Sequence, residues 1–435
     1  MRGQSRVGIA GTLVWLALVA ACGGPEAPPP MDTEPPPGEA PPETVRPGNT
    51  LWARPLGAVR GLDVEAAPDG SLALLAADDD PSGFDGQSVG GDLVLARYDP
   101  SGTLLEAKGM SAPGASKGRL ARTPDGYYVM AEVTSAANLG CGPIDATSAS
   151  LSSVVARLSA DGSCHWAMRQ GYLRSLSRGA DDGLWLLGDY DITRYDGAGA
   201  FRAHQSTVEM VGGRGNIDLH TMVRLNDGGA VFGGTSNGEM RLEGRSWSGQ
   251  VVPVLFRMAA DGRVVWVRPF PEVFGYISAV QVTPAGTILA LGSFNGQFQW
   301  AGARASSNGL SLLALEANGA ELWARPVGGQ VGATSATRMA VDAAGAVVVM
   351  AESPGACGGS GLMLAKVDAA GAFLWQRHFA PAGCVGEVRG HALATLPSRE
   401  IMVTGAFSGQ VSFGSQVLEQ RPGGRTEAFL LKLAP

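Results

Sequence analysis

After residue 50 the chain consists of short apolar runs separated by turn residues, and no part of it keeps helical apolar spacing for long. One unit shows the pattern clearly: apolar runs at 336–342, 346–351, 362–367 and 373–377 alternate with connections that contain Gly and Asp. Runs of this length are typical of β-strands, and Gly or Asp at a connection suits a tight hairpin turn. The pattern predicts repeated units of four short antiparallel strands.

Each unit closes on one motif, in which Gly is followed four residues later by Trp and six residues later by Arg, as in Gly319, Trp323 and Arg325. The copies match the motif to different degrees, and two of them lack Trp. The Trp position is occupied in chain order by Trp52, Glu106, Trp166, Ala203, Trp266, Trp323 and Trp375. These positions are 37 to 63 residues apart, which is typical of propeller blades.

The first copy of the motif stands apart from its unit. The last unit, residues 385–435, ends where its Trp strand is due, and that strand is found at residues 51–54. A repeat array whose first strand completes its last unit closes into a ring and leaves no open sheet edge between its ends. The sequence therefore predicts an all-β protein, a seven-bladed β-propeller of four-stranded antiparallel blades that occupies residues 50–435.

The units also resemble a known family. Gly292, Phe294 and Gly296, followed by a strand and then Trp323, are similar to the repeats of bacterial β-propeller repeat proteins of the SBBP type, and so is the stretch from Gly405 to Lys432. The resemblance covers residues 51–435. It implies a secreted or surface propeller whose repeats are structural, with no catalytic activity.

The N-terminus predicts export and lipidation. Residues 1–21 have a basic start and an apolar run, and Leu18 to Cys22 resembles a bacterial lipobox, which implies that Cys22 is lipidated. An ordinary secretory signal or an uncleaved anchor is the alternative. Residues 22–49 are rich in Pro and predict an extended tether. We expect a lipid-anchored protein of the bacterial outer membrane or cell surface, on a side that the sequence does not specify.

Charge limits the classes of partner. The formal net charge is −7, and after removal of residues 1–21 the 31 basic and 40 acidic residues that remain give −9. An acidic chain without a run of Lys and Arg does not indicate binding to nucleic acid or to anionic lipid. The membrane is therefore expected to be a partner through acyl chains alone.

No catalytic, metal or cofactor site emerges from residue spacing. The five histidines have no zinc spacing, and no nucleophile elbow is present. Acidic turns at the hairpins are explained by turn chemistry, which leaves the cluster Asp78–Asp80 as the one local candidate for calcium. We therefore predict no cofactor and no metal.

The repeated tryptophans Trp52, Trp166, Trp266, Trp323 and Trp375 allow two interpretations. They could stack on a ligand or dock a cofactor, or they could pack between blades while the Arg two residues on bonds a neighbouring carbonyl. Recurrence in nearly every unit favours packing.

The cysteines of an exported chain predict disulfides. Cys357 and Cys384 fall on the same face of successive blades and are expected to bond. Cys141 and Cys164 can bond if the loop 135–150 folds down the side of its blade.

The long connections are where a propeller is expected to carry function. Loops are predicted at 239–250, 296–309 and 410–426, among others, and they contain aromatic residues that either face a ligand or form local loop cores. These aromatic candidates are Phe84, Trp247, Trp300 and Phe413.

The leading functional hypothesis is a non-enzymatic binding or scaffold module that engages protein or glycan through its long-loop face. The rival is a propeller enzyme, a glycan lyase or a quinone- or calcium-dependent dehydrogenase with its site at the channel mouth. The enzyme predicts Asp, Glu, His or Arg side chains that converge there, and the scaffold predicts a shallow face of small polar residues. A largely structural envelope protein without a small ligand is a third alternative.

Overall fold

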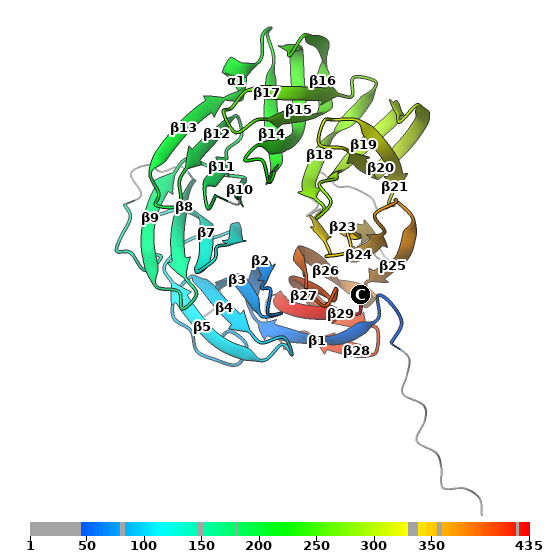
Figure 1. The fold of residues 1–435 in the computed structure, drawn as a ribbon. Coiled ribbons are helices and arrows are strands. Elements are labelled where there is room, and N and C mark those ends of the chain that lie inside the picture. Colours follow the sequence, from blue (N-terminus) through cyan, green and yellow to red (C-terminus); the bar gives the residue numbers. More distant parts are fainter. Residues whose placement is uncertain are drawn as a thin grey trace, which may run out of the picture. The chain divides into compact units, whose positions relative to one another are not determined.

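The computed structural model describes residues 45–78, 83–145, 151–179, 181–328, 338–354, 359–422 and 426–435, apart from the side chains of 306–308 and 383–384. Residues 45–435 form one unit. Its strands form seven sheets around a central channel (Figure 1). This confirms the predicted seven-bladed, all-β propeller.

Each of the first three blades has four strands, which follow one another from the channel to the rim. Blade 1 consists of β2 (Val59–Ala66), β3 (Leu72–Asp78), β4 (Leu93–Tyr98) and β5 (Leu104–Met110). Blade 2 consists of β6 (Gly118–Arg122), β7 (Gly126–Val133), β8 (Ser152–Ser159) and β9 (Cys164–Gln170). Blade 3 consists of β10 (Ser175–Arg178), β11 (Leu184–Leu187), β12 (Asp191–Tyr195) and β13 (Phe201–Ser206). The short helix α1 follows blade 3 and spans Thr207–Met210.

The next three blades repeat this order. Blade 4 consists of β14 (Asn216–Arg224), β15 (Ala230–Leu242), β16 (Arg245–Met258) and β17 (Val264–Pro269). Blade 5 consists of β18 (Val273–Val282), β19 (Ile288–Trp300), β20 (Ala303–Leu315) and β21 (Glu321–Pro326). Blade 6 consists of β22 (Arg338–Val341), β23 (Val347–Pro354), β24 (Ser360–Val367) and β25 (Phe373–Phe379).

Blade 7 closes the ring with strands from both ends of the chain. It consists of β26 (Pro381–Thr395), β27 (Ile401–Phe413), β29 (Glu427–Leu433) and β1 (Thr50–Gly57), and β28 (Gln416–Glu419) pairs with β27. In Figure 1 the blue β1 lies beside the red β29. The pairing of Trp52 with Lys432 confirms closure by residues 51–54, within a strand that runs on to Gly57.

The two chain ends also rebuild a turn. In blade 6 the turn before the rim strand has two backbone hydrogen bonds: Asp368 N–H donates to Ala372 O (2.9 Å) and Gly371 N–H donates to Asp368 O (3.0 Å). In blade 7 the chain is interrupted at this turn, and Ala434 takes the place of Asp368. Its N–H donates to Asn49 O (2.8 Å), and Gly48 N–H donates to Ala434 O (3.2 Å). The break in the chain therefore costs none of the turn's hydrogen bonds.

The hydrophobic core lies mainly between neighbouring blades. Middle strands such as β7 and β29 are buried along their whole length, whereas rim strands such as β5 are mostly half-buried or exposed. One cluster of buried side chains joins blades 1 and 2 through residues such as Leu75 and Val129, and another joins blades 7 and 1 through Leu430 and Leu74. A single blade cannot bury both of its faces, so the apolar faces favour a closed ring.

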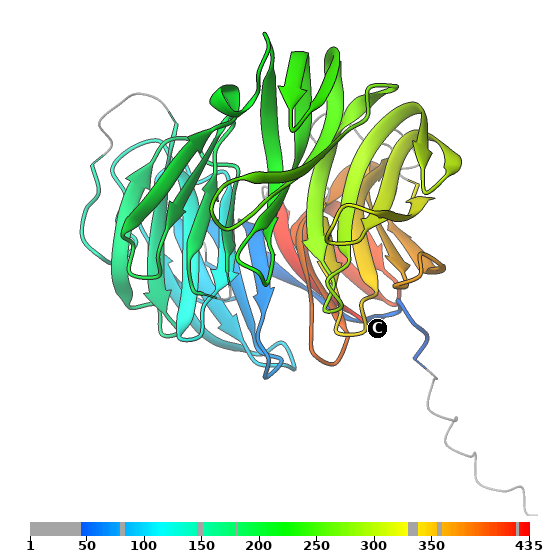
Figure 2. The ribbon, with the colours of Figure 1, turned by 45° about the horizontal axis from the view of Figure 1, so that its top comes forward.

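Three of the predicted long loops are instead hairpin extensions of the sheets. β15 and β16 pair out to Leu242 and Arg245, β19 and β20 pair to Trp300, and β27 pairs with β28. The extended hairpins of blades 4 and 5 lie on the upper side of the ring in Figure 2. Alternate side chains such as Met240 and Trp247 are buried, so the stretches carry strand periodicity that their Gly and Ser content obscured.

A repeated contact joins the rim of each Trp-bearing blade to the next blade. The indole lies over a Gly of positive φ in the neighbouring turn, so closely that a Cβ at Gly371 would lie 2.8 Å from the ring of Trp323. The indole N–H of Trp323 donates to Ala369 O (3.3 Å), and Arg325 donates to Gly371 O (2.8 Å). We call this contact the blade junction. Its Trp–Gly pairs are Trp52–Gly102, Trp166–Gly199, Trp266–Gly319, Trp323–Gly371 and Trp375–Gly48.

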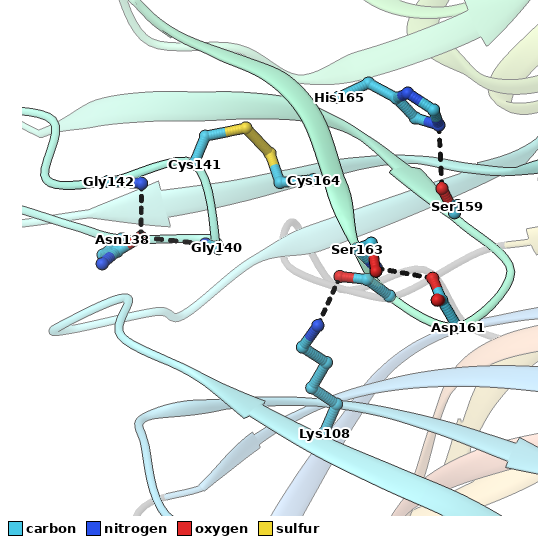
Figure 3. The surroundings of a disulfide bond; sticks show 11 residues. Lys108, Asn138, Gly140, Cys141, Gly142, Ser159, Asp161, Ser163, Cys164 and His165 are labelled. Atoms are coloured by element: carbon cyan, nitrogen blue, oxygen red, sulfur yellow. Dashed lines mark hydrogen bonds between the residues drawn. A yellow bond between two sulfur atoms is a disulfide. The ribbon is translucent and has the colours of Figure 1, made fainter.

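One predicted disulfide is present (Figure 3). Cys141 and Cys164 are bonded, with their Cα atoms 5.3 Å apart, which confirms this pairing. Asn138 shapes the loop, because its side-chain oxygen accepts the N–H groups of Gly140 (2.9 Å) and Gly142 (3.1 Å). Cys357 and the side chain of Cys384 lie outside the described residues.

We expect Trp323→Ala to lower the free energy of unfolding by about 2 kcal/mol, because the variant loses the indole's contact with Gly371 and its hydrogen bond. Urea denaturation followed by circular dichroism measures the change. The adjacent Leu322, 40% exposed, is the control, and Leu322→Ala should stay within about 0.5 kcal/mol of the parent. Equal losses in both variants would show that the junction contributes no specific stability.

Candidate functional site

The central channel holds a cavity of about 400 Å³ with an unusual set of charged walls. The innermost strands of all seven blades line it. Its ionisable lining residues are Asp63, Glu65, Arg119, Arg122, Arg174, Arg178, His220 and Arg338. Charged side chains of both signs therefore converge on the channel from separate blades.

The repeat places three of these residues at one level. Asp63, Arg119 and Arg338 each stand four residues before the residue that opens the first turn of their blade, which is Ala67, Thr123 or Asp342. Because every blade repeats the same topology, equivalent residues lie at the same depth in the channel. We call this level the channel layer. Its members are Asp63, Arg119, Ser175, Thr221, Ala279, Arg338 and Ala392.

Four of the innermost strands contain a bulge just before the channel layer. In β14 Leu219 pairs with Gly234 and Thr221 with Gly233, so His220 is the extra residue. The bulge in β26 leaves His391 in the same position. A bulge changes the direction of a side chain, which here brings His220 into the cavity wall. The His391 ring lies 2.8 Å from Gly61 O, and burial lowers the pKa of His391.

Asp63 holds two blades together. Its carboxylate accepts the N–H of Leu120 in blade 2 (2.9 Å) and its neighbour Val64's N–H (3.1 Å). Thr221 of blade 4 contacts blade 5 in the same way, because its hydroxyl accepts the N–H of Val280 (3.2 Å). Burial raises the pKa of Asp63, and the positive charge of Arg119 is the largest influence that opposes it.

Glu65 lies on the same face of β2, two residues further on. Burial and, next, the negative charge of Asp63 raise the pKa of Glu65 to about 8, against the opposing influence of Arg122. The Glu65 carboxyl is therefore protonated at neutral pH. It can donate a hydrogen bond, and it adds no negative charge to the cavity until the pH rises above about 8.

The arginines exceed the carboxylates in the cavity. Arg174 is paired with Asp189 and Asp218, and Arg178 with Asp182 at 2.7 Å, so outlying aspartates balance both. Three further arginines, Arg119, Arg122 and Arg338, line a cavity whose own acids are Asp63 and the protonated Glu65. The charge of Arg119, followed by burial, lowers the pKa of Arg338 to about 9. This level of the channel is net positive and favours an anion.

The residues that the sequence predicts as site residues lie outside the channel cavity. The five repeat tryptophans are at the rim in the blade junctions. Phe84, Trp247, Trp300 and Phe413 are buried, with at most 8% exposure. Phe413 packs against Phe379 and Phe429, for example, with ring centroids 5.2 and 4.9 Å apart. These aromatics form the cores of loops and hairpins.

The calcium candidate and the N-terminal site are described only in part. Asp78 ends β3, and Asp79, Asp80 and Cys22 lie outside the described residues. Within the described ranges there is no group of three or more His, Cys, Asp and Glu that could hold a metal. Across the same ranges no helix has the length and apolar character needed to cross a membrane.

Motif spacing could not find the channel residues, because each blade contributes only one or two of them. A usable signal is present nonetheless. When the sequences of the units are aligned on their first turn, Asp63, Arg119 and Arg338 fall at the same alignment position. That position belongs to an innermost strand, where apolar or small residues are expected. A charged residue at the innermost strand of a propeller points to the channel.

Comparison with known proteins gives distant structural likeness and no family. No protein-family model matches the chain, and no curated protein sequence matches it. Among solved structures, a chain of the mitotic checkpoint complex is similar with a TM-score of 0.49 and 11% identity, covering 97% of this chain and 99% of that one.

Two enzymes are similar in the same way. The hydrazine synthase of Kuenenia stuttgartiensis has a TM-score of 0.47 and 11% identity, covering 84% of this chain and 96% of that one. A polysaccharide lyase, an ulvan lyase, has a TM-score of 0.46 and 10% identity, covering 82% and 92%. Likeness at this level carries no argument about binding or catalysis.

Proposed function

We propose that the ring is a non-enzymatic binding module that takes the carboxylate of an acidic sugar into its central channel. The observation that supports this function is the cavity of about 400 Å³ whose arginines come from different blades. This channel site differs from the site expected from the sequence, which was the long-loop face. The aromatic candidates of the long-loop face are buried.

The chemistry of the walls selects the ligand class. Guanidinium groups bind carboxylates through paired, charge-assisted hydrogen bonds, and Arg119 and Arg338 stand in the same channel layer. The protonated Glu65 and the Ser and Thr hydroxyls of the lining offer further polar contacts of the kind that sugar hydroxyls use. The volume lies within the usual range for small-ligand pockets, about 300–1,000 Å³.

Binding fits the geometry better than catalysis. The Asp63 carboxylate already accepts hydrogen bonds from the N–H groups of Leu120 and Val64, so Asp63 has a structural role. Among the described channel residues, the hydroxyls of Ser177 and Thr221 accept backbone N–H groups instead of bonding to a base. No activated nucleophile is formed by these groups.

A second candidate function rests on Glu65. A carboxyl with a pKa of about 8 is suited to exchange a proton at neutral pH, and arginines next to it could stabilise an enolate-like anion. That arrangement corresponds to a glycan lyase. Incubation with the acidic oligosaccharide used for binding distinguishes the two, because a lyase generates an unsaturated product with ultraviolet absorbance.

We also propose that the ring is held at the bacterial outer membrane or cell surface by a lipidated Cys22 and the tether 22–49. The lipobox-like run Leu18 to Cys22 and the Pro-rich composition support this location. A lipid anchor on an extended tether would leave the channel open to soluble or surface glycans.

Arg338→Gln is expected to weaken the binding of a galacturonic acid oligosaccharide at least tenfold, because a charge-assisted contact is lost. Isothermal titration calorimetry measures the dissociation constant. The matched control is Arg245→Gln, which removes the same charge from an exposed hairpin residue, and a neutral glucose oligosaccharide tests charge selectivity. Equal affinity of Arg338→Gln and the parent, or binding of the neutral sugar, contradicts the proposal.

The affinity for this acidic sugar should fall about tenfold as the pH rises through about 8, because Glu65 ionises there and repels the ligand's carboxylate. Below that pH Glu65 is neutral and no repulsion arises. Titrations at a series of pH values test this, and Glu65→Gln should remove the step near pH 8. A step that survives in Glu65→Gln would assign it to another group.

Cells that express the full chain should incorporate labelled palmitate into it, and Cys22→Ser should abolish the label. The reason is that the thiol of Cys22 is the acceptor in the lipobox hypothesis. Mass spectrometry of the N-terminal peptide provides the independent measurement. Retention of Cys22→Ser in the membrane fraction without label would support an uncleaved anchor instead.

A further inference from the structure

The charged residues of the channel cavity stand at two levels along the channel. One level is the channel layer, which contributes Asp63, Arg119 and Arg338 to the cavity wall. Residues two or three positions further along β2, β6 and β10 line the same cavity at a second level. The ionisable residues of this second level are Glu65, Arg122 and Arg178. A strand rises about 3.3 Å per residue, so the two levels are about 7 to 10 Å apart.

Arg122 is the cation of the second level that the protein leaves open to a ligand. Among the residues that the structure describes, none forms a hydrogen bond or an ion pair with the Arg122 side chain. The other arginine of this level, Arg178, is paired with Asp182 at 2.7 Å. The Glu65 carboxyl also has no hydrogen-bond partner in the described ranges. The polar groups of Arg122 and Glu65 are therefore available to a molecule in the cavity.

The carboxyl groups near Arg122 do not neutralise it. Burial is the main reason why the pKa of Glu65 is raised to about 8, so this carboxyl is uncharged at pH 7. Asp69 lies in the exposed turn after β2, and its Oδ1 accepts the N–H (3.0 Å) and the hydroxyl (2.6 Å) of Ser71. Solvent screens the attraction that remains between Asp69 and Arg122. The second level therefore presents the positive charge of Arg122 to the cavity.

The channel layer offers the other position for an anion. The positive charge of Arg119 is the largest cause of the lowered pKa of Arg338, so the two guanidinium groups lie near each other. Arg119 Nη1 donates to Gly118 O (2.9 Å), and no carboxylate of the described residues forms an ion pair with Arg119. A carboxylate beside both arginines would relieve their repulsion. One cavity of about 400 Å³ thus presents positive charge at two places.

We propose that the channel binds a chain of acidic sugars lengthwise, with one carboxylate at Arg119 and Arg338 and the carboxylate of a following sugar at Arg122. This inference rests on the proposed function and extends its ligand from one acidic sugar to at least two in one chain. The unpaired guanidinium of Arg122 can bind a carboxylate through two parallel hydrogen bonds. The uncharged Glu65 carboxyl can donate a hydrogen bond to the same carboxylate or to a sugar hydroxyl.

A chain fits the two levels better than two separate small anions. Both levels line one continuous cavity, so a single molecule can reach both. Once the first carboxylate is bound, the second binds at a high effective concentration, because the sugar chain holds it nearby. Separate anions lack this advantage, and each would have to bind to its own level alone. A ligand with two linked carboxylates is therefore expected to bind more tightly than one of equal length with a single carboxylate.

The test compares two disaccharides by isothermal titration calorimetry on the full-length protein. Digalacturonic acid has two carboxylates, and galacturonosyl-galactose is the matched ligand of equal length with one. The parent should bind digalacturonic acid at least tenfold more tightly. Arg122→Gln should reduce this ratio of affinities to about one. Arg338→Gln should weaken the binding of both disaccharides, because the channel layer holds the carboxylate that they share.

Arg245→Gln is the control variant, because it removes the same charge from an exposed hairpin residue and should leave the ratio at its parental value. Arg122→Met keeps the length of the side chain without its charge and repeats the test if Arg122→Gln does not fold. Equal affinity of the parent for both disaccharides overturns the inference alone, and so does a tenfold preference that persists in a folded Arg122 variant. Failure of the parent to bind either disaccharide overturns the proposed function and this inference with it.

Discussion

The meeting of the two chain ends in blade 7 is the constraint on which the rest of the structure depends. A blade has apolar side chains on both faces, so each needs a neighbour on either side, and only a closed ring provides one for every blade. Closure rests on the pairing of β1 with β29 and on the two hydrogen bonds between Ala434 and residues 48 and 49. Trp375 then lies over Gly48 as other junction tryptophans lie over theirs.

Closure also makes the channel site. Once seven equivalent strands surround one axis, residues from blades 1, 2 and 6 that are far apart in sequence stand at one level. Asp63 and Arg119 come together because of that register, and the pKa shifts of Glu65 and Arg338 follow from enclosing their charges in a narrow space. A rigid ring can keep such a cluster, because the charged side chains are held by strands that pack on both faces.

The fold could be predicted from sequence for a physical reason that does not extend to the site. Blade architecture is local: the Gly, Trp and Arg of the motif lie within seven residues, and the unit recurs, so the signal adds up over the chain. The same holds for Cys141 and Cys164, which belong to one blade. The hairpin at Trp247 escaped prediction because Gly and Ser interrupt its apolar alternation. The channel layer was not predicted because it forms only when the ring closes. Each blade contributes one residue to it, so its members have no characteristic spacing within a short stretch of sequence.

Residues that differ from the repeat are informative in such a chain, because the other blades show which residue normally stabilises each position. At Glu106 the departure is compensated within the blade: Arg97 pairs with the carboxylate at 3.4 Å, and Lys108 covers the next turn. At Ala203 the next turn is covered by two side chains of the same blade, since a Cβ at Gly262 would lie 3.0 Å from the Arg194 side chain and 3.2 Å from that of Gln205. Blade 3 also has an indole on its second strand instead of its fourth: Trp185 contacts Phe232 of blade 4 at 6.0 Å between ring centroids and lines a cavity beside Ala203. At both positions without Trp, polar side chains therefore cover the turn of the next blade, so the ring keeps its junctions closed by a second kind of contact.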